Sequence, residues 1–197
     1  MIEVLYSIDS AIFHFCNQAL ANPIFDAIMA PITNWNQSPV GIAFFTLLWL
    51  FIFIKGGKRG RTAALLLIPL IFLSDQLSSS VIKSIVARPR PCHEVDGAAI
   101  ISNIHLLVPC GSGYSFPSSH AANNFAFATM MTFFYRRLWY LFFAYAGLMG
   151  FSRISVGVHY PSDVLGGALV GAVLAFGVYG VWSYFSRKYP ALTLKDV

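Results

Sequence analysis

Three short segments of the chain combine cationic, hydroxyl, imidazole and carboxylate side chains. They are Lys83-x6-Arg90-Pro91, Pro117-Ser118-Ser119-His120 and Ser152-Arg153-x5-His159-x3-Asp163. Each segment alone is a weak signal, but the three in this order form a specific combination. If the fold brings them together, they supply cations for an anionic group and two imidazoles that can act as nucleophile or proton carrier at neutral pH.

The cations of these segments suit a phosphoryl group. Lys83, Arg90 and Arg153 would provide a concentrated positive field and donors that match phosphoryl oxygens. This field can stabilise the transferred charge without Mg²⁺, so we expect no metal and no cofactor. Histidines and acids of the intervening loop could imitate a metal site, but they lack a recognisable ligand spacing. They are His93, Glu94, Asp96 and His105.

The second segment predicts an anion site at a helix start. Pro117 suits the beginning of a helix, and backbone N–H groups near Ser118 and Ser119 would be free to bind an anion with support from the helix dipole. The Ser118 hydroxyl could add a further donor. We therefore expect Ser118 and Ser119 to bind the same phosphate as the cations.

The residues next to each of the two histidines predict different roles for them. Asp163 lies four residues after His159, across Pro161, so its carboxylate could accept from one ring nitrogen and aim the other at phosphorus. His159 is the predicted nucleophile. His120 is predicted to protonate the departing oxygen and later to activate water.

The composition is that of a membrane protein. The chain has 197 residues, of which 57% are hydrophobic and 11% charged, whereas about 25% of residues are charged in a soluble domain. The mean hydropathy is +0.66. The net charge of +5 comes from short clusters between apolar stretches and lacks an aromatic-basic motif, so we expect membrane lipids rather than nucleic acid as partners.

The hydrophobic pattern predicts an all-α polytopic bundle with three regions: amphipathic interfacial helices in residues 1–36, a transmembrane domain in 37–188 and a cytoplasmic tail in 189–197. An amphipathic helix over Ile2–Leu20 is expected in the interface, followed by a break at Asn22-Pro23 and a short helix over Ile24–Ile32. Whether the first helix crosses as a sixth span is left open. Five apolar segments approach the length of about 20 residues that crosses a bilayer. They are Val40–Ile54, Thr62–Ile82, Ala121–Tyr135, Leu138–Val156 and Val164–Phe185.

The basic clusters predict the orientation of these spans. Threading five spans puts three clusters on one side, which the positive-inside rule makes cytoplasmic. The clusters are Lys55 to Arg61, Arg136 with Arg137, and Arg187 to Lys195. The three chemical segments, together with Arg88, then fall on the opposite side. We expect the site to face the periplasm or the cell exterior.

With these motifs in place, the chain resembles the type 2 phosphatidic acid phosphatase family, whose core and active site are shared with the vanadium haloperoxidases. The resemblance runs from about Val40 to Phe185. It implies a metal-independent lipid phosphatase with a phosphohistidine intermediate, with His159 as nucleophile and with Lys83, Arg90, Ser118, Ser119 and Arg153 as the phosphate cradle. Ser119 stands where the family often has glycine, which implies that this position need not adopt positive φ.

Weaker features have mainly structural interpretations. Asp75, inside the second span, is expected to pair or to hydrogen bond within the bundle. Asn123 and Asn124 predict hydrogen bonds between helices. The pair Cys92 and Cys110, which brackets the outer loop, could form a disulfide or remain free. Close helix packing is indicated by three glycines of the last span. They are Gly166, Gly167 and Gly171.

The substrate is an expectation from family analogy alone. Undecaprenyl diphosphate, in a bacterial inner membrane, is the first choice, and phosphatidylglycerol phosphate, phosphatidic acid and lipid A are alternatives. A phosphate or lipid transporter is a remote alternative, because it predicts charges spread along a pathway near the midplane. The oligomeric state does not follow from the sequence.

Overall fold

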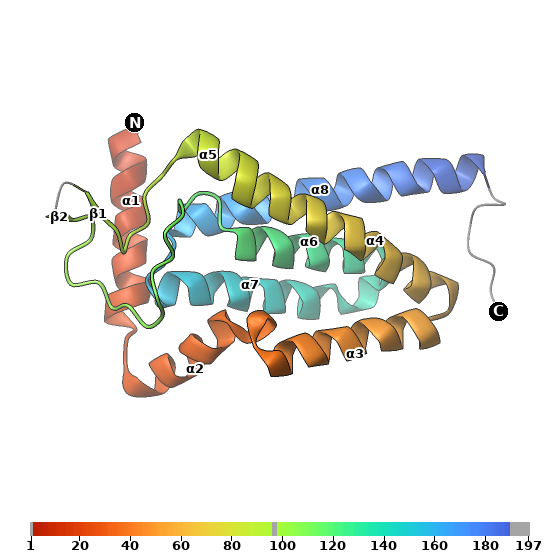
Figure 1. The fold of residues 1–197 in the computed structure, drawn as a ribbon, viewed down its shortest axis with the longest axis horizontal. Helices are drawn as coiled ribbons and strands as arrows, with labels where there is room; N and C mark the ends of the chain where they lie inside the picture. Colours follow the sequence, from red (N-terminus) through yellow and green to blue (C-terminus); the bar gives the residue numbers. More distant parts are fainter. Residues whose placement is uncertain (1, 96–97, 190–197) are drawn as a thin grey trace.

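The computed structural model describes residues 2–95 and 98–189. Most of this part is helical, and the helices form one elongated bundle with two shorter helices at one end (Figure 1). The α-helices are α1 (Ile2–His14), α2 (Pro23–Thr33), α3 (Pro39–Lys55), α4 (Gly57–Gln76), α5 (Lys83–Val86), α6 (Ser119–Phe134), α7 (Trp139–Ser155) and α8 (Pro161–Lys188). The predicted all-α bundle is confirmed, apart from two short paired strands in the outer loop, β1 (Glu94–Val95) and β2 (Ala98–Ala99).

The five segments predicted as spans all form helices. The segment Thr62–Ile82 is part of a longer run, because a π-helical stretch, η3 (Leu77–Ile82), joins α4 to α5. The run Gly57–Val86 and the helix Pro161–Lys188 are both long and apolar enough to cross a membrane, and Pro39–Lys55 is a shorter apolar helix. The first chemical segment therefore begins inside a helix, since Lys83 opens α5.

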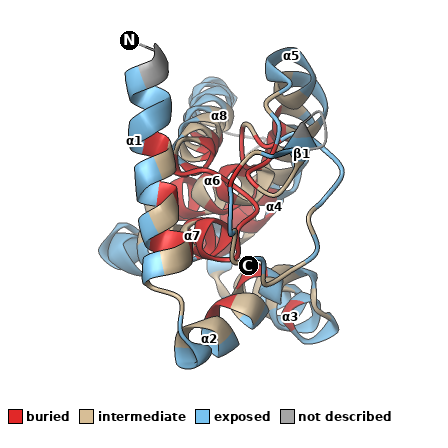
Figure 2. Cartoon of the chain, turned by 90° about the vertical axis from the view of Figure 1, so that its left-hand side faces the viewer, coloured by how far each residue is buried: buried red, intermediate tan, exposed pale blue. Residues whose placement is uncertain are grey.

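Helix α6 lies in the middle of the bundle and packs against α8, α7 and α4, as Figure 2 shows in a view along the bundle. Glycines of α8 permit the closest approach. A Cβ atom on Gly167 would lie 2.4 Å from the carbonyl oxygen of Ser118, and one on Gly171 would lie 2.1 Å from that of Ala122. The predicted close packing at these glycines is confirmed, and Gly166 similarly makes room for the Phe116 ring.

Polar side chains inside the bundle bond as the sequence indicates. The amide of Asn123 on α6 donates to Asp75 on α4 over 3.3 Å, so the predicted hydrogen bonding of Asp75 within the bundle is confirmed. The neighbouring Asn124 instead donates to the carbonyl of His120 one turn earlier, over 2.8 Å. Of the two asparagines, Asn123 is thus the one that joins two helices.

The two ends of the bundle differ in chemistry. The turn between α3 and α4, the connection from α6 to α7 and the end of α8 all lie at one end (Figure 1). There Arg59, Arg136 and Arg137 line one shared hollow, as expected if the basic clusters share one side of the membrane. The predicted tail lies outside the described residues from position 190 onward.

Helices α1 and α2 cover the opposite end. Helix α1 runs across the bundle axis (Figure 1) and continues as a π-helical turn, η1 (Phe15–Ala19). The predicted break follows: Asn22 caps α2 by accepting from Ile24 and Phe25. A 3-10 turn, η2 (Trp35–Gln37), then leads into α3. Because α1 contacts α8 and α2 contacts α7, these helices form part of the same packed unit. Their place in the membrane interface stays a prediction.

Replacing Gly171 by alanine should destabilise the protein, since the new methyl group would overlap the backbone of α6. Overpacking of this kind costs about 1–3 kcal/mol. The matched control is Gly177→Ala on the same helix, where nothing lies within 4 Å of the added atom and alanine favours the helix by up to about 1 kcal/mol. Thermal unfolding of both variants in detergent checks this. Equal midpoints would contradict the packing argument.

Candidate active site

The three chemical segments meet at the end of the bundle that carries α1 and α2. Lys83 begins α5, Arg90 lies in the loop that follows, and Ser118 is the N-cap of α6. Arg153 lies in the last turn of α7, and Asp163 in the first turn of α8. His159 occupies the turn between α7 and α8. The ends of four helices thus converge on one region.

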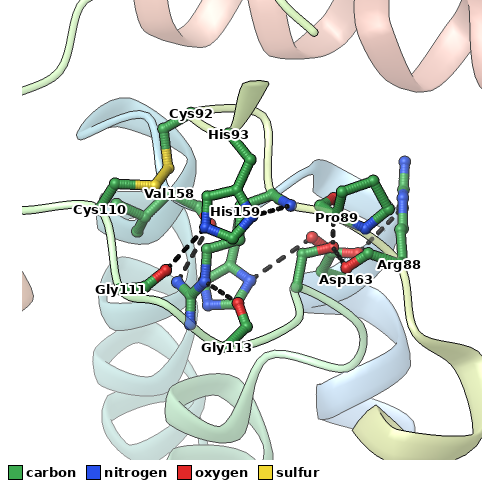
Figure 3. Close-up of a disulfide and its surroundings, with 12 residues drawn as sticks. Arg88, Pro89, Cys92, His93, Cys110, Gly111, Gly113, Val158, His159 and Asp163 are labelled. Carbon is green, nitrogen blue, oxygen red and sulfur yellow. Dashed lines mark hydrogen bonds and ion pairs between the residues drawn. A yellow bond between two sulfur atoms is a disulfide. The ribbon is translucent and has the colours of Figure 1, made fainter. Parts of the chain in front are cut away.

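His159 is fixed between a carboxylate and the cations. Its Nδ1 atom lies 3.4 Å from Oδ2 of Asp163, a loose contact of the kind common in unliganded sites. The same carboxylate oxygen accepts from the backbone N–H of Tyr160 at 2.8 Å. Pro161 is the first residue of α8. Because Nδ1 faces Asp163, Nε2 points to the opposite side of the ring (Figure 3).

The predicted phosphate-binding arginines bond to neutral acceptors among the described residues. Arg90 donates from Nε to the carbonyl of Gly113 at 2.7 Å, and Arg153 donates from Nη1 to the hydroxyl of Thr33 at 2.9 Å. Within residues 2–95 and 98–189, neither these two nor Lys83 has a carboxylate oxygen within 4 Å. Both arginines are buried. Three positive charges are therefore held together without neutralisation, which favours binding of an anion.

The start of α6 differs in detail from the prediction. Pro117 precedes the N-cap and is not the first helical residue, and the N–H of Ser118 is taken, because it donates to the carbonyl of Asp163 at 2.9 Å. The expectation of a free N–H at Ser118 is thus wrong: this contact joins α6 to α8. The Ser118 hydroxyl caps α6 by accepting from the N–H of Ala121 at 3.4 Å, so the N–H groups of Ser119 and His120 are the ones that remain for an anion. Ser119 does not have positive φ, as expected.

His120 lies beside the cations and contacts a residue that the motifs do not include. Its Nε2 atom is 3.3 Å from Nε2 of Gln37, which ends the 3-10 turn before α3. The same N-terminal region supplies Thr33, whose hydroxyl holds Arg153. Sequence reasoning missed both residues, because an isolated polar side chain before a span gives no signal of its own.

A disulfide closes the outer loop. Cys92 and Cys110 are bonded, which resolves the alternatives left open by the sequence. Next to the bridge, Nε2 of His93 lies 2.8 Å from the carbonyl of Gly111 (Figure 3). This loop also supplies the carbonyl of Gly113 that accepts from Arg90. The disulfide therefore restrains the loop segment whose carbonyl group orients Arg90. Asp96, one of the residues considered for a metal site, lies outside the described residues.

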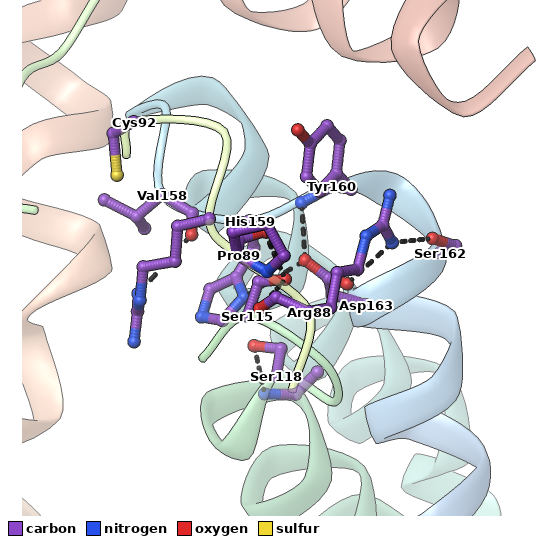
Figure 4. Close-up of polar contacts among 12 residues, drawn as sticks. Arg88, Pro89, Cys92, Ser115, Ser118, Val158, His159, Tyr160, Ser162 and Asp163 are labelled. Carbon is purple, nitrogen blue, oxygen red and sulfur yellow. Dashed lines mark hydrogen bonds and ion pairs between the residues drawn. The ribbon is translucent and has the colours of Figure 1, made fainter. Parts of the chain in front are cut away.

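Arg88 is a third residue of this region that the motifs did not single out. It lies between Lys83 and Arg90 in the first segment, yet its guanidinium points to the carboxylate of Asp163 at 2.9 Å and to that of Asp9 on α1 at 2.7 Å. Figure 4 shows it on the Asp163 side of His159. Its spacing could have suggested a fourth cation of the cradle, but its contacts place it beside Asp163, behind the predicted nucleophile.

The electrostatics of the site favour a neutral His159. Burial lowers the pKa of its imidazole well below the ordinary range, and the charges of Arg90, Arg153 and Lys83 lower it further. A neutral imidazole keeps the lone pair that a nucleophile needs. The cations that would bind an anion therefore also hold His159 in its reactive form.

Comparison with known proteins identifies the family to which this arrangement belongs. The sequence profile of the PAP2 superfamily matches residues 64–187, a range that contains all three chemical segments. The chain belongs to the PAP2 superfamily. It is therefore a membrane lipid phosphatase, a hydrolase of a metal-independent family.

Proteins with known names resemble the chain over most of its length. A lipid A 4'-phosphatase of Bacteroides thetaiotaomicron is 28% identical over 94% of this chain and 79% of its own. The undecaprenyl-diphosphatase BcrC of Bacillus subtilis is 30% identical over 79% of this chain and 74% of its own. The crystal structure of a transmembrane PAP2-type phosphatidylglycerolphosphate phosphatase from Bacillus subtilis matches with a TM-score of 0.71 at 25% identity, over 93% of this chain and 89% of that one.

The lowered pKa of His159 predicts a pH effect on stability. His159 of the unfolded chain takes up a proton near its ordinary pKa of about 6.5, whereas folded His159 stays neutral. Below that pH the unfolded state binds more protons, so stability falls on acidification. His159→Gln removes this contribution and should lose less stability between about pH 7.5 and about pH 5.5. Thermal unfolding midpoints in detergent measure both slopes, and identical slopes would refute the assignment.

Proposed function

We propose that this PAP2 protein hydrolyses a lipid phosphate or diphosphate through a phosphohistidine on His159. One observation carries the proposal: a buried imidazole with Asp163 against Nδ1 and with the unneutralised Lys83, Arg90 and Arg153 nearby. The charge arrangement suits a phosphoryl group, whose oxygens need positive donors during transfer. Arg153 Nε and the Ser119 hydroxyl, buried and without partners among the described residues, support the same site, because buried donors are normally satisfied.

The first step forms a covalent intermediate. The Nε2 lone pair of His159 attacks phosphorus, and the bond between phosphorus and the lipid oxygen breaks. Protonated His120 gives its proton to the departing oxygen, which leaves as an alcohol or as a lipid monophosphate. The positive charge on the phosphorylated imidazole is balanced by Asp163 across Nδ1. Lys83, Arg90 and Arg153 stabilise the equatorial oxygens.

The second step uses the same groups in reverse. His120, now neutral, removes a proton from water, and the hydroxide oxygen attacks phosphorus as the N–P bond breaks. Inorganic phosphate leaves, and His159 regains its lone pair. Gln37, in contact with Nε2 of His120, lies where the departing oxygen or the water would approach. This residue can orient either one by hydrogen bonding.

The membrane arrangement supports action at the side away from the cytoplasm. We propose that α3, the run from α4 to α5, α6, α7 and α8 are five spans of a bacterial inner membrane. The basic end then faces the cytoplasm, and the site faces the periplasm or the cell exterior at headgroup depth. A disulfide in the loop beside the site suits an oxidising compartment.

An apolar cavity offers a place for a lipid tail. It has a volume of about 340 Å³ and lies between α3, α4 and α6, lined by side chains that include Phe45, Leu67 and Phe127. At their outer ends, these helices lead to Gln37, Lys83 and His120. A lipid whose hydrocarbon chain occupied this cavity would place its phosphate group at the outer ends of these helices, near the site.

Undecaprenyl diphosphate is the substrate that we put first, supported by the likeness to BcrC of Bacillus subtilis. The 4'-phosphate of lipid A is the second candidate. It is favoured by the extent of the match to the Bacteroides thetaiotaomicron phosphatase, which covers 94% of this chain and so reaches the N-terminal helices that complete the site.

The covalent intermediate can be trapped. Incubation of wild-type protein with a radiolabelled lipid phosphate and rapid denaturation should give acid-labile, base-stable label on the protein, and His159→Ala should give none. Turnover of His159→Ala should fall by at least about 10³-fold, as expected for loss of a covalent nucleophile. Near-full turnover of this variant, or no label on active wild-type protein, would overturn the mechanism.

A substrate panel identifies the lipid. We expect purified protein in detergent with EDTA to release phosphate from undecaprenyl diphosphate with the highest kcat/KM, ahead of lipid A and phosphatidylglycerol phosphate. A preference for lipid A with release from its 4' position would replace the first candidate by the second. Loss of all activity on addition of EDTA would contradict a metal-free reaction.

A further inference from the structure

Arg88 lies between two carboxylates that are far apart in the sequence. Its Nη1 atom donates to Oδ1 of Asp163 at 2.9 Å, and its Nη2 atom donates to Oδ2 of Asp9 at 2.7 Å. Asp163 is fully buried and Asp9 is 7% exposed. This fork connects the first turn of α8 to the middle of α1, the helix that crosses the end of the bundle.

Further contacts fix the guanidinium in one orientation. Ser162 donates from its backbone N–H to Oδ1 of Asp9 at 2.8 Å and accepts from Arg88 Nη1 at 2.6 Å. The guanidinium also lies over the Tyr160 ring, 3.9 Å from its centroid, and Tyr160 packs in turn on Phe13 of α1. Arg88 is therefore held by partners on α1 and at the start of α8.

These contacts determine how Asp163 is presented to His159. Oδ1 of Asp163 is bound by Arg88, and Oδ2 is bound by the N–H of Tyr160. Rotation of the carboxylate would break both bonds. Oδ2 is thus kept facing Nδ1 of His159 at 3.4 Å. Without Arg88, Oδ1 would lose this donor and the carboxylate would lose its charged partner.

The charges give a second reason for the arrangement. A buried carboxylate without a partner is strongly disfavoured, and Arg88 supplies that partner. Burial by itself would lower the pKa of Arg88, but the charges of Asp163 and Asp9 outweigh it and raise the pKa. Asp9 restores a net negative charge behind Nδ1, since Asp163, Arg88 and Asp9 sum to one negative charge. The cations of the cradle lie near the same imidazole.

The chain adopts an uncommon conformation to reach this position. Ala87, the C-cap residue that follows α5, has φ of 50°, a left-handed conformation that is unfavourable for a residue with a side chain. Ser115 then donates its N–H to the carbonyl of Arg88 at 2.8 Å. Such strain persists where surrounding contacts over-determine it, and here those contacts centre on Arg88.

We propose that Arg88 and Asp9 are positioning residues for the nucleophile, so that α1 is part of the active site of this phosphatase. Arg88 fixes the carboxylate of Asp163, Asp9 fixes Arg88, and neither touches the phosphate. The inference rests on the proposed function, because it assigns these residues to the reaction of His159.

The test compares Arg88→Gln and Asp9→Asn with wild type, using any lipid of the panel that the wild type hydrolyses. Outer partners that orient the histidine and carboxylate ligands of metal sites are worth about 10–100-fold. Because Arg88 and Asp9 orient Asp163 in the same way, kcat and the rate of phosphohistidine formation should fall by about that factor in both variants. The inhibition constant of inorganic phosphate, which reports on the cradle, should stay within about 3-fold of wild type. Arg88→Lys keeps the positive charge but cannot donate to both carboxylates in the same geometry, so its kcat should lie between those of wild type and Arg88→Gln.

Two controls separate positioning from general structure. Asp26→Asn removes another carboxylate of the outer face, which pairs with His105 at 2.9 Å and does not contact His159, and it should keep wild-type kcat. If Asp9 acts through Asp163, the variant Asp9→Asn/Asp163→Asn should be no slower than Asp163→Asn alone. A multiplicative loss would show that Asp9 acts by another route and would overturn the proposal.

Other outcomes are equally decisive. Wild-type kcat in folded Arg88→Gln and Asp9→Asn would overturn the inference while leaving the phosphatase itself intact. A rise in the phosphate inhibition constant equal to the fall in kcat would place Arg88 in the cradle instead. Should Arg88→Gln not fold, Arg88→Lys and Asp9→Asn decide the question by the same measurements. An inactive wild type across the whole panel would refute the proposed function.

Discussion

The contact between the beginnings of α6 and α8 is the interaction on which the rest of the site depends. Ser118 donates its N–H to the carbonyl of Asp163, and its own carbonyl lies directly over Gly167, where no Cβ atom would fit. This contact sets two helix N-termini side by side. His120 follows one of them and His159 precedes the other, so the distance between the two imidazoles is a consequence of how closely the helices pack.

Around this contact, the fold separates charge. Lys83, Arg90 and Arg153 come from three different elements and lack carboxylate partners within the described ranges, although mutual repulsion disfavours such a group. The rest of the bundle must hold them: backbone carbonyls accept from Arg90 and a hydroxyl accepts from Arg153. Neutral acceptors fix the geometry without cancelling the charge. A protein that paired each arginine with a carboxylate would be more stable without bound phosphate. Its attraction for phosphate would be weaker.

The sequence was informative where spacing reports directly on structure. Apolar stretches predicted the helices, Asn22-Pro23 predicted the break after α1, and glycines of α8 predicted its packing on α6. Spacing could not reveal Asp9, Thr33 or Gln37, because each reaches the site only through tertiary contacts of a helix or turn that looks merely amphipathic or polar. The sequence shows Arg88 as a basic residue on the side of the membrane where the positive-inside rule does not expect one. The direction in which its side chain points, however, depends on the left-handed turn at Ala87. No local pattern predicts that turn at an alanine.

The position of these missed residues along the chain is itself informative. The PAP2 profile begins at residue 64, so Asp9, Thr33 and Gln37 all precede the part that defines the family. The family core contains every group that would react, but the second layer behind Asp163 and Arg153, and the contact to His120, come from α1, α2 and η2. Chemistry is thus encoded in the core, while the N-terminal helices fix its geometry and border the approach to His120. Differences among PAP2 phosphatases in orientation of the nucleophile or in the leaving group accepted are therefore expected to map to this N-terminal region more than to the three motifs.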